Sequence, residues 1–319
     1  MNEKNCRYIF GPVPSRRLGQ SLGINNIPPK VCTYSCVYCQ LGRTAKLQIE
    51  RNAFYEPEEI LKEVKDKIKK TRKIGEYIDY LTFVPDGEPT LDINLGKEIE
   101  LLKSLGIKIA VITNSSLLYN KDLWENLSKA NLVSLKIDSV REHVWRKINR
   151  PHKRLNLDLI LDGILGFASY YRGKLITETM FVKGLNDGIE QIYEIVDFLS
   201  LLRPFKAYLS IPTRPPAEKW VQPPEEEKIS SIFQIFKKRI EQVEYLIGYE
   251  GNAFAFTGDI EEDLMSITSV HPMREDAVKE FLSKAKVDRT IIQKLVANKE
   301  LIVMEYKGKR FYMRRFQRS

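Results

Sequence analysis

Long apolar segments, cysteines and histidines are all scarce in this chain. It has no run of about eighteen apolar residues, so no membrane-spanning helix is expected. The first residues, Met1 to Cys6, lack the apolar stretch of a secretory signal, which makes a reducing, cytoplasmic location the expected one. None of the three histidines is paired with another at a zinc-ligand spacing, which disfavours a zinc site.

The length and net charge of the chain place only wide limits on its domain number and on its partners. The 319-residue chain is long enough for one large α/β domain and a small second domain. Hydrophobic residues make up 43% of it and charged residues 29%, which is typical of globular proteins. The net charge of +9 permits an anionic partner such as a nucleic acid, but does not require one, because the basic residues are spread along the chain.

Three of the four cysteines lie within eight residues, as Cys32, Cys36 and Cys39. A four-iron cluster usually takes four thiolates, so three leave one iron without a protein ligand. An open coordination position is typical of catalytic metal centres. The spacing therefore predicts a [4Fe–4S] cluster that acts on a bound molecule. A core role, a zinc site and a disulfide are the alternatives, and we disfavour all three.

Strand and helix patterns alternate after the cysteines, and the Gly- and Pro-rich stretch before them is expected to be irregular up to residue 21. The apolar runs suit strands that are buried on both faces of a parallel sheet, which binds ligands at the C-terminal strand ends. We predict strands at 22–25, 80–84, 107–113, 132–137, 175–182 and 205–211, and helices at 57–73, 93–105, 122–129, 156–170, 189–202 and 225–243.

Several residues at or after these strand ends are candidates for ligand binding. Glycine allows close approach of the backbone, and a carboxylate can accept hydrogen bonds from an ammonium group. The same residue types also form ordinary turns and helix caps. The candidates are Gly87, Glu88 and Pro89, then Thr113 and Asn114, Asp138 and Ser139, and Ile211.

Other residues are candidates for substrate contacts or proton transfer. Adjacent arginines can bind a carboxylate or phosphate, and a lysine or glutamate can transfer protons. Solvated surface residues or core residues are the alternative interpretation for each. The candidates are Arg16, Arg17, Arg150, His152 and Lys153 for substrate, and Lys183 and Glu178 for catalysis.

The C-terminal part has a different pattern. Helices are expected at 275–285 and 287–299, followed by strands at 301–306 and 310–313, which is the layout of a winged helix. Residues 299–319 carry seven basic and two acidic residues, with aromatic residues between them. This segment is either a surface for RNA or a protein, or a small cap on the main domain. We expect domains at 1–260 and 261–319.

The pattern CxxxCxΦC, with Tyr38 as its aromatic residue, resembles the signature of radical S-adenosylmethionine (radical SAM) enzymes. The stretch Gly-Pro-Val-Pro-Ser-Arg-Arg-Leu-Gly is similar to one subfamily, known only as iron–sulfur oxidoreductases and distantly similar to wyosine-base synthases. The resemblance covers roughly residues 8 to 260. It implies a partial (β/α)6 TIM-like barrel, to which the C-terminal pattern adds a small winged-helix-like domain.

The resemblance also implies roles for the candidate residues. The cysteines would bind a [4Fe–4S] cluster, which, reduced by an external electron donor, cleaves S-adenosylmethionine to a 5′-deoxyadenosyl radical. That radical takes hydrogen from a substrate, for which RNA or a protein is favoured. Asp86 stands where the family's Gly-Gly-Glu-type motif has its first glycine. The residues expected to contact S-adenosylmethionine are Tyr38, Gly87, Glu88, Pro89, Thr113, Asn114, Asp138, Ser139 and Ile211.

Cysteine number disfavours some relatives. Only Cys6 remains for a second cluster, so twin-cluster enzymes and the wyosine-base reaction are not expected. An alternative function is an iron–sulfur regulator that senses redox state and binds nucleic acid, and a third is a glycyl-radical activase. The sequence identifies neither the substrate nor the oligomeric state.

Overall fold

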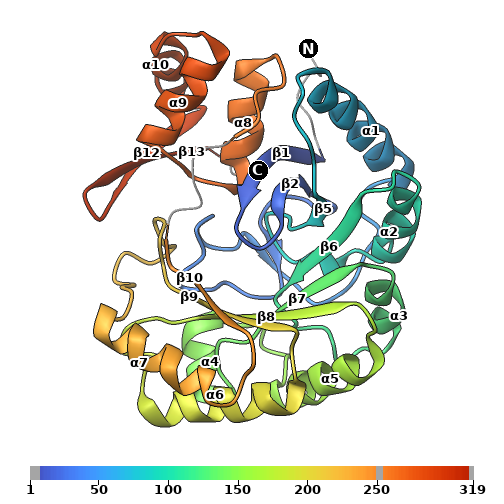
Figure 1. Cartoon of the computed structure of the whole chain (residues 1–319), viewed down its shortest axis with the longest axis vertical. Coiled ribbons are helices and arrows are strands. Elements are labelled where there is room, and N and C mark those ends of the chain that lie inside the picture. The colour runs from blue at the N-terminus through green and yellow to red at the C-terminus, as the bar shows by residue number, and fades with distance from the viewer. Residues whose placement is uncertain (1–7, 249–253, 316–319) are drawn as a thin grey trace.

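A curled sheet of eight strands forms the centre of the molecule (Figure 1). The structure is a computed structural model that describes residues 8–248 and 254–315. Neighbouring strands are parallel except for the first pair, which is antiparallel. In order across the sheet the strands are β1 (Ile9–Ser15), β2 (Gly19–Ile24), β5 (Tyr80–Phe83), β6 (Lys108–Thr113), β7 (Leu132–Lys136), β8 (Lys174–Met180), β9 (Lys206–Ser210) and β10 (Val243–Leu246).

Helices run around the outside of this sheet (Figure 1). In α1, for example, proline occupies the first turn, Glu58 and Glu59 favour the helix N-terminus, and Ile60 and Val64 are buried in the core. No helix in the described ranges is long and apolar enough to cross a bilayer. The helices are α1 (Pro57–Lys73), η1 (Pro89–Leu91), α2 (Leu95–Lys103), α3 (Asp122–Ser128), α4 (Glu142–Asn149), α5 (Leu157–Tyr170), α6 (Ile189–Leu202) and α7 (Glu226–Lys237).

The sheet encloses a layer of apolar side chains near the beginnings of its parallel strands. Leu18, in the turn between β1 and β2, packs against the side chains of four other strands. This layer fills one end of the half-barrel, as stacked side-chain layers do in closed barrels. Ligands therefore have access at the opposite end, where the strands finish. The layer consists of Leu18, Ala110, Leu132, Ile176 and Tyr208.

The predicted α/β half-barrel is confirmed, and strands β5 to β9 begin and end within two residues of their predicted limits. The prediction of an irregular segment up to residue 21 is wrong, because Ile9–Ser15 forms β1. A proline is tolerated there because β1 is an edge strand with an irregularity between Phe10 and Val13. The predicted helix 225–243 is too long, since α7 ends at Lys237 and Val243–Leu246 forms β10.

The C-terminal elements, residues 260–315, are here called the C-terminal unit. Its three strands form a separate sheet in the order β11-β13-β12. Its apolar side chains form one cluster that includes Phe10 and Val13 of β1. The helix–helix–hairpin order predicted from the sequence is present. The elements are α8 (Ile260–Val270), β11 (Met273–Arg274), α9 (Glu275–Ala285), α10 (Thr290–Ala297), β12 (Leu301–Tyr306) and β13 (Lys309–Arg314).

A buried ion pair joins the C-terminal unit to the half-barrel. Lys67 Nζ of α1 lies 2.6 Å from Asp263 Oδ1 of α8, and both side chains are 1% exposed. Thr257 Oγ1 contacts both groups, at 2.8 Å from Lys67 Nζ and 2.7 Å from Asp263 Oδ1. Removing one member of such a pair leaves an uncompensated buried charge.

We predict that Lys67→Met lowers the free energy of unfolding by about 3–5 kcal/mol, because it strands the Asp263 carboxylate in the core. Urea unfolding of the full chain measures the effect. Lys69→Met, at an exposed position of the same helix, is the matched control and should change stability by less than about 0.5 kcal/mol. Equal losses in the two variants would contradict the prediction.

Candidate functional site

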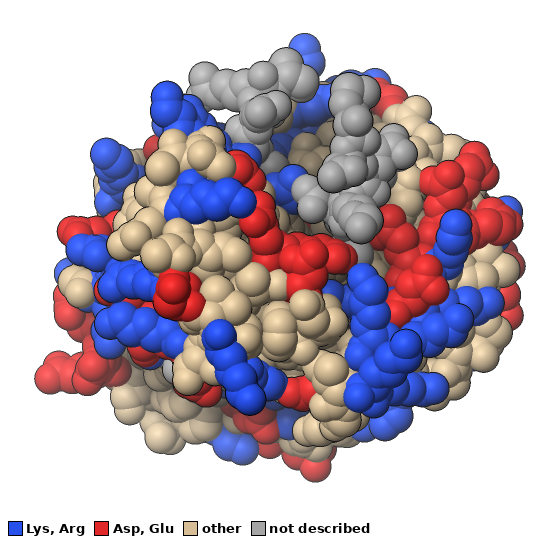
Figure 2. All heavy atoms as spheres, turned by 90° about the horizontal axis from the view of Figure 1, so that it is seen from above, with Lys and Arg blue, Asp and Glu red and all other residues tan. Residues whose placement is uncertain are grey.

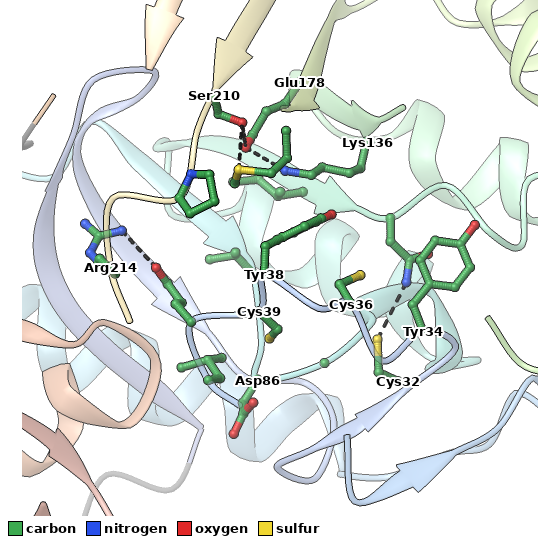
Figure 3. A pocket seen from close by; sticks show the side chains of 18 of the residues that line it. Cys32, Tyr34, Cys36, Tyr38, Cys39, Asp86, Lys136, Glu178, Ser210 and Arg214 are labelled. Carbon is green, nitrogen blue, oxygen red and sulfur yellow. Dashed lines mark hydrogen bonds and ion pairs between the residues drawn. The ribbon is translucent and has the colours of Figure 1, made fainter. Parts of the chain in front are cut away.

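A cavity of about 330 Å³ opens where the parallel strands end. Its walls come from the cysteine segment and from the loops that follow β5, β6 and β9. Figure 3 shows the three cysteines on one side of it and Lys136, Glu178 and Ser210 on another. The sequence-predicted candidates that line the cavity are Arg16, Arg17, Cys32, Cys36, Tyr38, Cys39, Gly87, Glu88, Thr113, Asn114, Glu178 and Ile211.

The cysteine loop, residues 30–44, is held on two sides by backbone hydrogen bonds. On one side, the N–H groups of Ser35 and Val37 donate to the carbonyls of Asn149 (3.0 Å) and Ile148 (2.9 Å) at the end of α4. On the other, the Glu88 N–H donates to the Val31 carbonyl at 3.2 Å. The short strand β3 (Val31–Cys32) near the start of the loop pairs in parallel with β4 (Lys46–Leu47), which follows the loop. The three thiols are therefore carried on a fixed backbone.

Gly87 makes the second of these contacts possible. A Cβ atom at this position would lie 1.9 Å from the Val31 carbonyl oxygen, far inside van der Waals contact. Gly87 also forms an isolated parallel bridge with Val31. Glycine is thus required here by close backbone approach. The contact sets the distance between the cysteine loop and the loop after β5.

The three cysteines are partly buried, and two of their thiols accept hydrogen bonds. Asn114 Nδ2 donates to Cys32 Sγ at 3.6 Å, and Asn149 Nδ2 donates to Cys36 Sγ at 3.4 Å. Burial raises the pKa of all three thiols, and that of Cys36 to about 12. Metal binding at these thiols must therefore displace their protons.

The donor set fits an iron–sulfur cluster better than a single metal ion. Within residues 8–248 and 254–315, no three His, Cys, Asp or Glu side chains are placed to hold one metal ion. In a cluster each thiolate binds a different iron, so the sulfur atoms stand farther apart than they do around one ion. Three soft sulfur ligands that line one cavity meet this requirement.

The Glu88 carboxylate is occupied by the protein itself. Its Oε1 atom accepts hydrogen bonds from Thr113 Oγ1 (2.6 Å), Thr90 Oγ1 (2.6 Å) and Thr90 N (3.1 Å). Its Oε2 atom accepts from Asn114 N at 2.7 Å. The side chain is 1% exposed, and burial raises its pKa despite these hydrogen bonds. Glu88 thus joins the loops after β5 and β6, and since its Oε2 atom accepts only one of these hydrogen bonds, its contact with a cofactor stays a prediction.

Asp86 is a second buried carboxylate at the cavity. Its side chain lines the cavity and is buried, and its Oδ2 atom has no hydrogen-bond partner within the described residues. Lys30 Nζ lies 3.8 Å from its Oδ1 atom. Burial raises the pKa of the Asp86 carboxyl group, while the Lys30 ammonium group lowers it. The resulting pKa of Asp86 is about 7. A buried acceptor without a partner is a natural place for a cationic ligand group.

Asp138 and Ser139 lie outside the 330 Å³ cavity. Asp138 Oδ2 accepts hydrogen bonds from the Tyr38 hydroxyl and from Asn149 Nδ2 (2.8 Å), while Oδ1 accepts from Met180 N (2.8 Å). Ser139 Oγ bonds only to the backbone of Arg141 among the described residues. Asp138 therefore orients the Tyr38 ring, and the structure gives neither residue an oxygen directed into the cavity.

Arg17, Lys136 and Glu178 form a charged cluster that lines the cavity. This cluster is here called the floor triad. Glu178 of β8 pairs with Arg17 (2.5 Å) and with Lys136 of β7 (2.7 Å). Ser210 Oγ donates to the same carboxylate at 2.9 Å. Burial alone would raise the pKa of Glu178, but the two cations lower it to about 2. A carboxylate this acidic is a poor proton acceptor, which argues against Glu178 as a general base.

Other candidates lie away from the cavity. Lys183 is half exposed and pairs with Glu225 at 2.5 Å, and Arg150 pairs with Glu218. His152 and Lys153 follow the Arg150 turn outside the cavity, and Pro89 is buried in η1. None of these residues lines the cavity, although backbone hydrogen bonds from Ser35 to Arg150 (3.2 Å) and from His152 to Thr33 (2.9 Å) hold two of them beside the cysteine loop. Cys6 lies outside the described residues.

Sequence reasoning missed several residues at the site. Lys136 could have been predicted, because a lysine in the apolar run 132–137 must face a polar feature inside the half-barrel. Lys30 and Gln40 flank the cysteines without any motif. Arg214, in the loop after β9, lines the cavity rim. Asn149 is found only from the fold, since α4 was not predicted.

We predict that Gly87→Ala prevents cluster assembly, because its Cβ would displace the Val31 carbonyl and with it the start of the cysteine loop. Iron and sulfide content after anaerobic reconstitution measures this. Gly106→Ala is the control: Gly106 also has a positive φ of 69° but open space around it, so only backbone strain of about 1 kcal/mol is added. Loss of iron from both variants would show that backbone strain, and not the close approach of Gly87 to Val31, prevents cluster assembly.

Two curated proteins are similar to much of this chain. UPF0026 protein MJ1312 of Methanocaldococcus jannaschii is 52% identical over 307 residues, which cover 96% of this chain and 95% of that protein. UPF0026 protein slr1464 of Synechocystis sp. is 36% identical over 209 residues, 65% of this chain and 76% of that protein.

Solved structures show the same fold. A radical SAM methyltransferase from Sphaerobacter thermophilus superposes with a TM-score of 0.54 at 14% identity, over 71% of this chain and 66% of that chain. The structure of TYW1 with a lysine–pyruvate adduct bound gives a TM-score of 0.52 at 16% identity, over 70% and 76%.

The sequence model of the Radical SAM superfamily matches residues 26–199, a range that holds the cysteine loop, Gly87 and strands β5 to β8. Members of this superfamily use a [4Fe–4S] cluster and S-adenosylmethionine, and one structural neighbour, Streptococcus suis SuiB, was solved with S-adenosylmethionine bound. The chain belongs to the radical SAM superfamily and, within it, to the UPF0026 proteins.

Proposed function

We propose that the cavity holds a [4Fe–4S] cluster on Cys32, Cys36 and Cys39 and S-adenosylmethionine beside it, and that the protein abstracts hydrogen from an anionic substrate or from part of one. The observation that carries the proposal is that three partly buried cysteines and Asp86, whose Oδ2 atom is buried without a hydrogen-bond partner, line one cavity. When bound, the cluster and S-adenosylmethionine supply radical chemistry that no side chain can provide.

The chain's own residues bind and orient these groups. Asp86 Oδ2 accepts a hydrogen bond from the ammonium group of S-adenosylmethionine, whose charge keeps the Asp86 carboxylate ionised by lowering its pKa. Asn114 and Asn149 donate to the sulfur atoms of Cys32 and Cys36, which reduces the charge they present. Tyr38, fixed by Asp138, and Ile211 supply apolar wall for the adenosine part.

We propose that the C-terminal unit caps the cavity. Gln40, next to Cys39, donates to the Val270 carbonyl at 3.0 Å, and its Oε1 accepts from Arg214 Nη1 at 2.9 Å. Arg214 Nη2 lies 3.0 Å from His271 Nε2. At the far end of the unit, the Tyr306 hydroxyl donates to the Pro212 carbonyl at 3.1 Å. These contacts tie the cysteine loop and the loop after β9 to the unit.

The surface of the molecule gives less support to a nucleic-acid reader. Figure 2, which looks onto the end that carries α8–α10, shows Lys and Arg interspersed with Asp and Glu and no continuous basic face. Several basic side chains of the unit are paired, such as Arg289 with Glu275 and Lys294 with Glu261. The winged-helix-like layout and the 1–260 and 261–319 division stay proposals, and we favour the cap.

The remaining proposals concern the setting. We propose a cytoplasmic enzyme that receives its electron from an external donor, with RNA or a protein as the macromolecular substrates to be tried first. An iron–sulfur regulator is disfavoured, because a sensor needs no chain of βα units around an open cluster and no unpartnered carboxylate at its side.

We expect the reconstituted protein to form 5′-deoxyadenosine from S-adenosylmethionine and dithionite under anaerobic conditions, with the product measured by liquid chromatography. Cys36→Ala should reduce the yield at least about a hundredfold, because one of three cluster ligands is lost. The surface variant Arg172→Gln should match wild type. A cluster that assembles in wild type without any deoxyadenosine would favour the regulator.

We further expect His271→Asn to weaken binding of S-adenosylmethionine about three- to tenfold, because one hydrogen-bonded contact that holds Arg214 against Gln40 is altered. Equilibrium titration of the oxidised protein measures this, at unchanged iron content. His143→Asn, at an exposed position on α4, is the matched control. If His271→Asn leaves this affinity unchanged but abolishes RNA binding, the cap proposal is wrong.

A further inference from the structure

The floor triad carries an excess positive charge in a mostly buried place. Glu178 is shared by Arg17 and Lys136, and the three side chains are only 12%, 16% and 17% exposed, respectively. Burial alone would lower the pKa of Lys136, but the carboxylates of Glu178 and Asp138 raise it overall, so Lys136 stays protonated. Two cations thus share one carboxylate. A buried net charge is costly unless an opposite charge approaches it.

Arg16 adds a second positive charge at the same side of the cavity. It precedes Arg17 in the β1–β2 turn and lines the cavity together with it. Its guanidinium donates one hydrogen bond, to the Tyr245 carbonyl at 3.2 Å, and forms no ion pair with any residue in the described ranges. A guanidinium has five donors, so most of them are available to a ligand.

The other ionised groups of the cavity do not neutralise this excess. Lys30 and Asp86 form a balanced pair on the opposite wall. Glu88 is enclosed by its hydrogen bonds with Thr90, Thr113 and Asn114. Even when Asp86, Glu88, Glu178 and the nearby Asp138 are all ionised, these four are outnumbered by the five cations Arg16, Arg17, Lys30, Lys136 and Arg214.

The cluster and S-adenosylmethionine together leave the net charge of the cavity unchanged. The oxidised four-iron core has two positive charges and its three thiolates have three negative ones, which sum to minus one. S-adenosylmethionine carries a sulfonium, an ammonium and a carboxylate, which sum to plus one. The two contributions cancel whichever residues they touch. A site complete with both cofactors therefore still attracts an anion.

We infer that the substrate presents a carboxylate or phosphate group to Arg16 and the floor triad, close to the carbon that loses its hydrogen. This inference rests on the proposed function and names its substrate class. A planar guanidinium binds either anion in a bidentate manner. The anionic group enters at the Arg16 side, where an exposed guanidinium lines the cavity.

The test is calorimetric titration of the reconstituted, oxidised protein, saturated with S-adenosylmethionine, with inorganic phosphate, acetate and uncharged acetamide at constant ionic strength. We expect phosphate or acetate to bind and acetamide not to bind. Phosphate binding alone assigns a phosphate ester, acetate binding alone assigns a carboxylate, and binding of both supports the anion site. Arg16→Gln should weaken anion binding about tenfold.

Arg172→Gln, an exposed arginine outside the cavity, is the control and should bind anions as wild type does. The inference is overturned if neither anion binds better than acetamide, or if Arg172→Gln weakens binding as much as Arg16→Gln. Deoxyadenosine formation is measured separately. If the wild type forms deoxyadenosine but binds no anion, only the substrate class is rejected. If the wild type forms no deoxyadenosine, the proposed function is rejected.

Discussion

The close approach of Gly87 to the Val31 carbonyl is the contact on which the rest of the site depends. It brings the loop after β5 against the start of the cysteine loop, so that Asp86 and the cysteine thiols line the same cavity. The end of α4 holds the loop from the other side through Ser35 and Val37. A loop fixed at both sides has little conformational entropy left to lose when a ligand binds.

The charges of the cavity are arranged in two layers. Close to the cysteines, Asp86 and Lys30 balance each other, and one carboxylate oxygen is left for a cationic group. At the floor, Arg17 and Lys136 outnumber Glu178. A cation is therefore favoured beside the cluster and an anion farther from it. The C-terminal unit contacts a cavity residue, because Gln40 donates a hydrogen bond to the Val270 carbonyl.

The sequence alone was sufficient to predict the repeated strands and the clustered cysteines. The five central strands and the position of the thiols followed from apolar runs and cysteine spacing, because both depend on neighbours in the chain. The hydrogen-bond partners of Glu88 and Asp138 did not follow. Their carboxylates are occupied by Thr113, Asn114, Tyr38 and Asn149, which lie far away in the sequence or on the unpredicted α4. Strand β1 was missed because its prolines are tolerated only at a sheet edge.

The central claim is that three thiolates leave one iron of the cluster open to S-adenosylmethionine. Mössbauer spectroscopy of the ⁵⁷Fe-reconstituted protein, with and without S-adenosylmethionine, tests it most directly. The account predicts that one iron in four changes its isomer shift when S-adenosylmethionine is added, while the other three do not. Four irons that stay equivalent, or a spectrum of a single iron bound by three sulfurs, would contradict it.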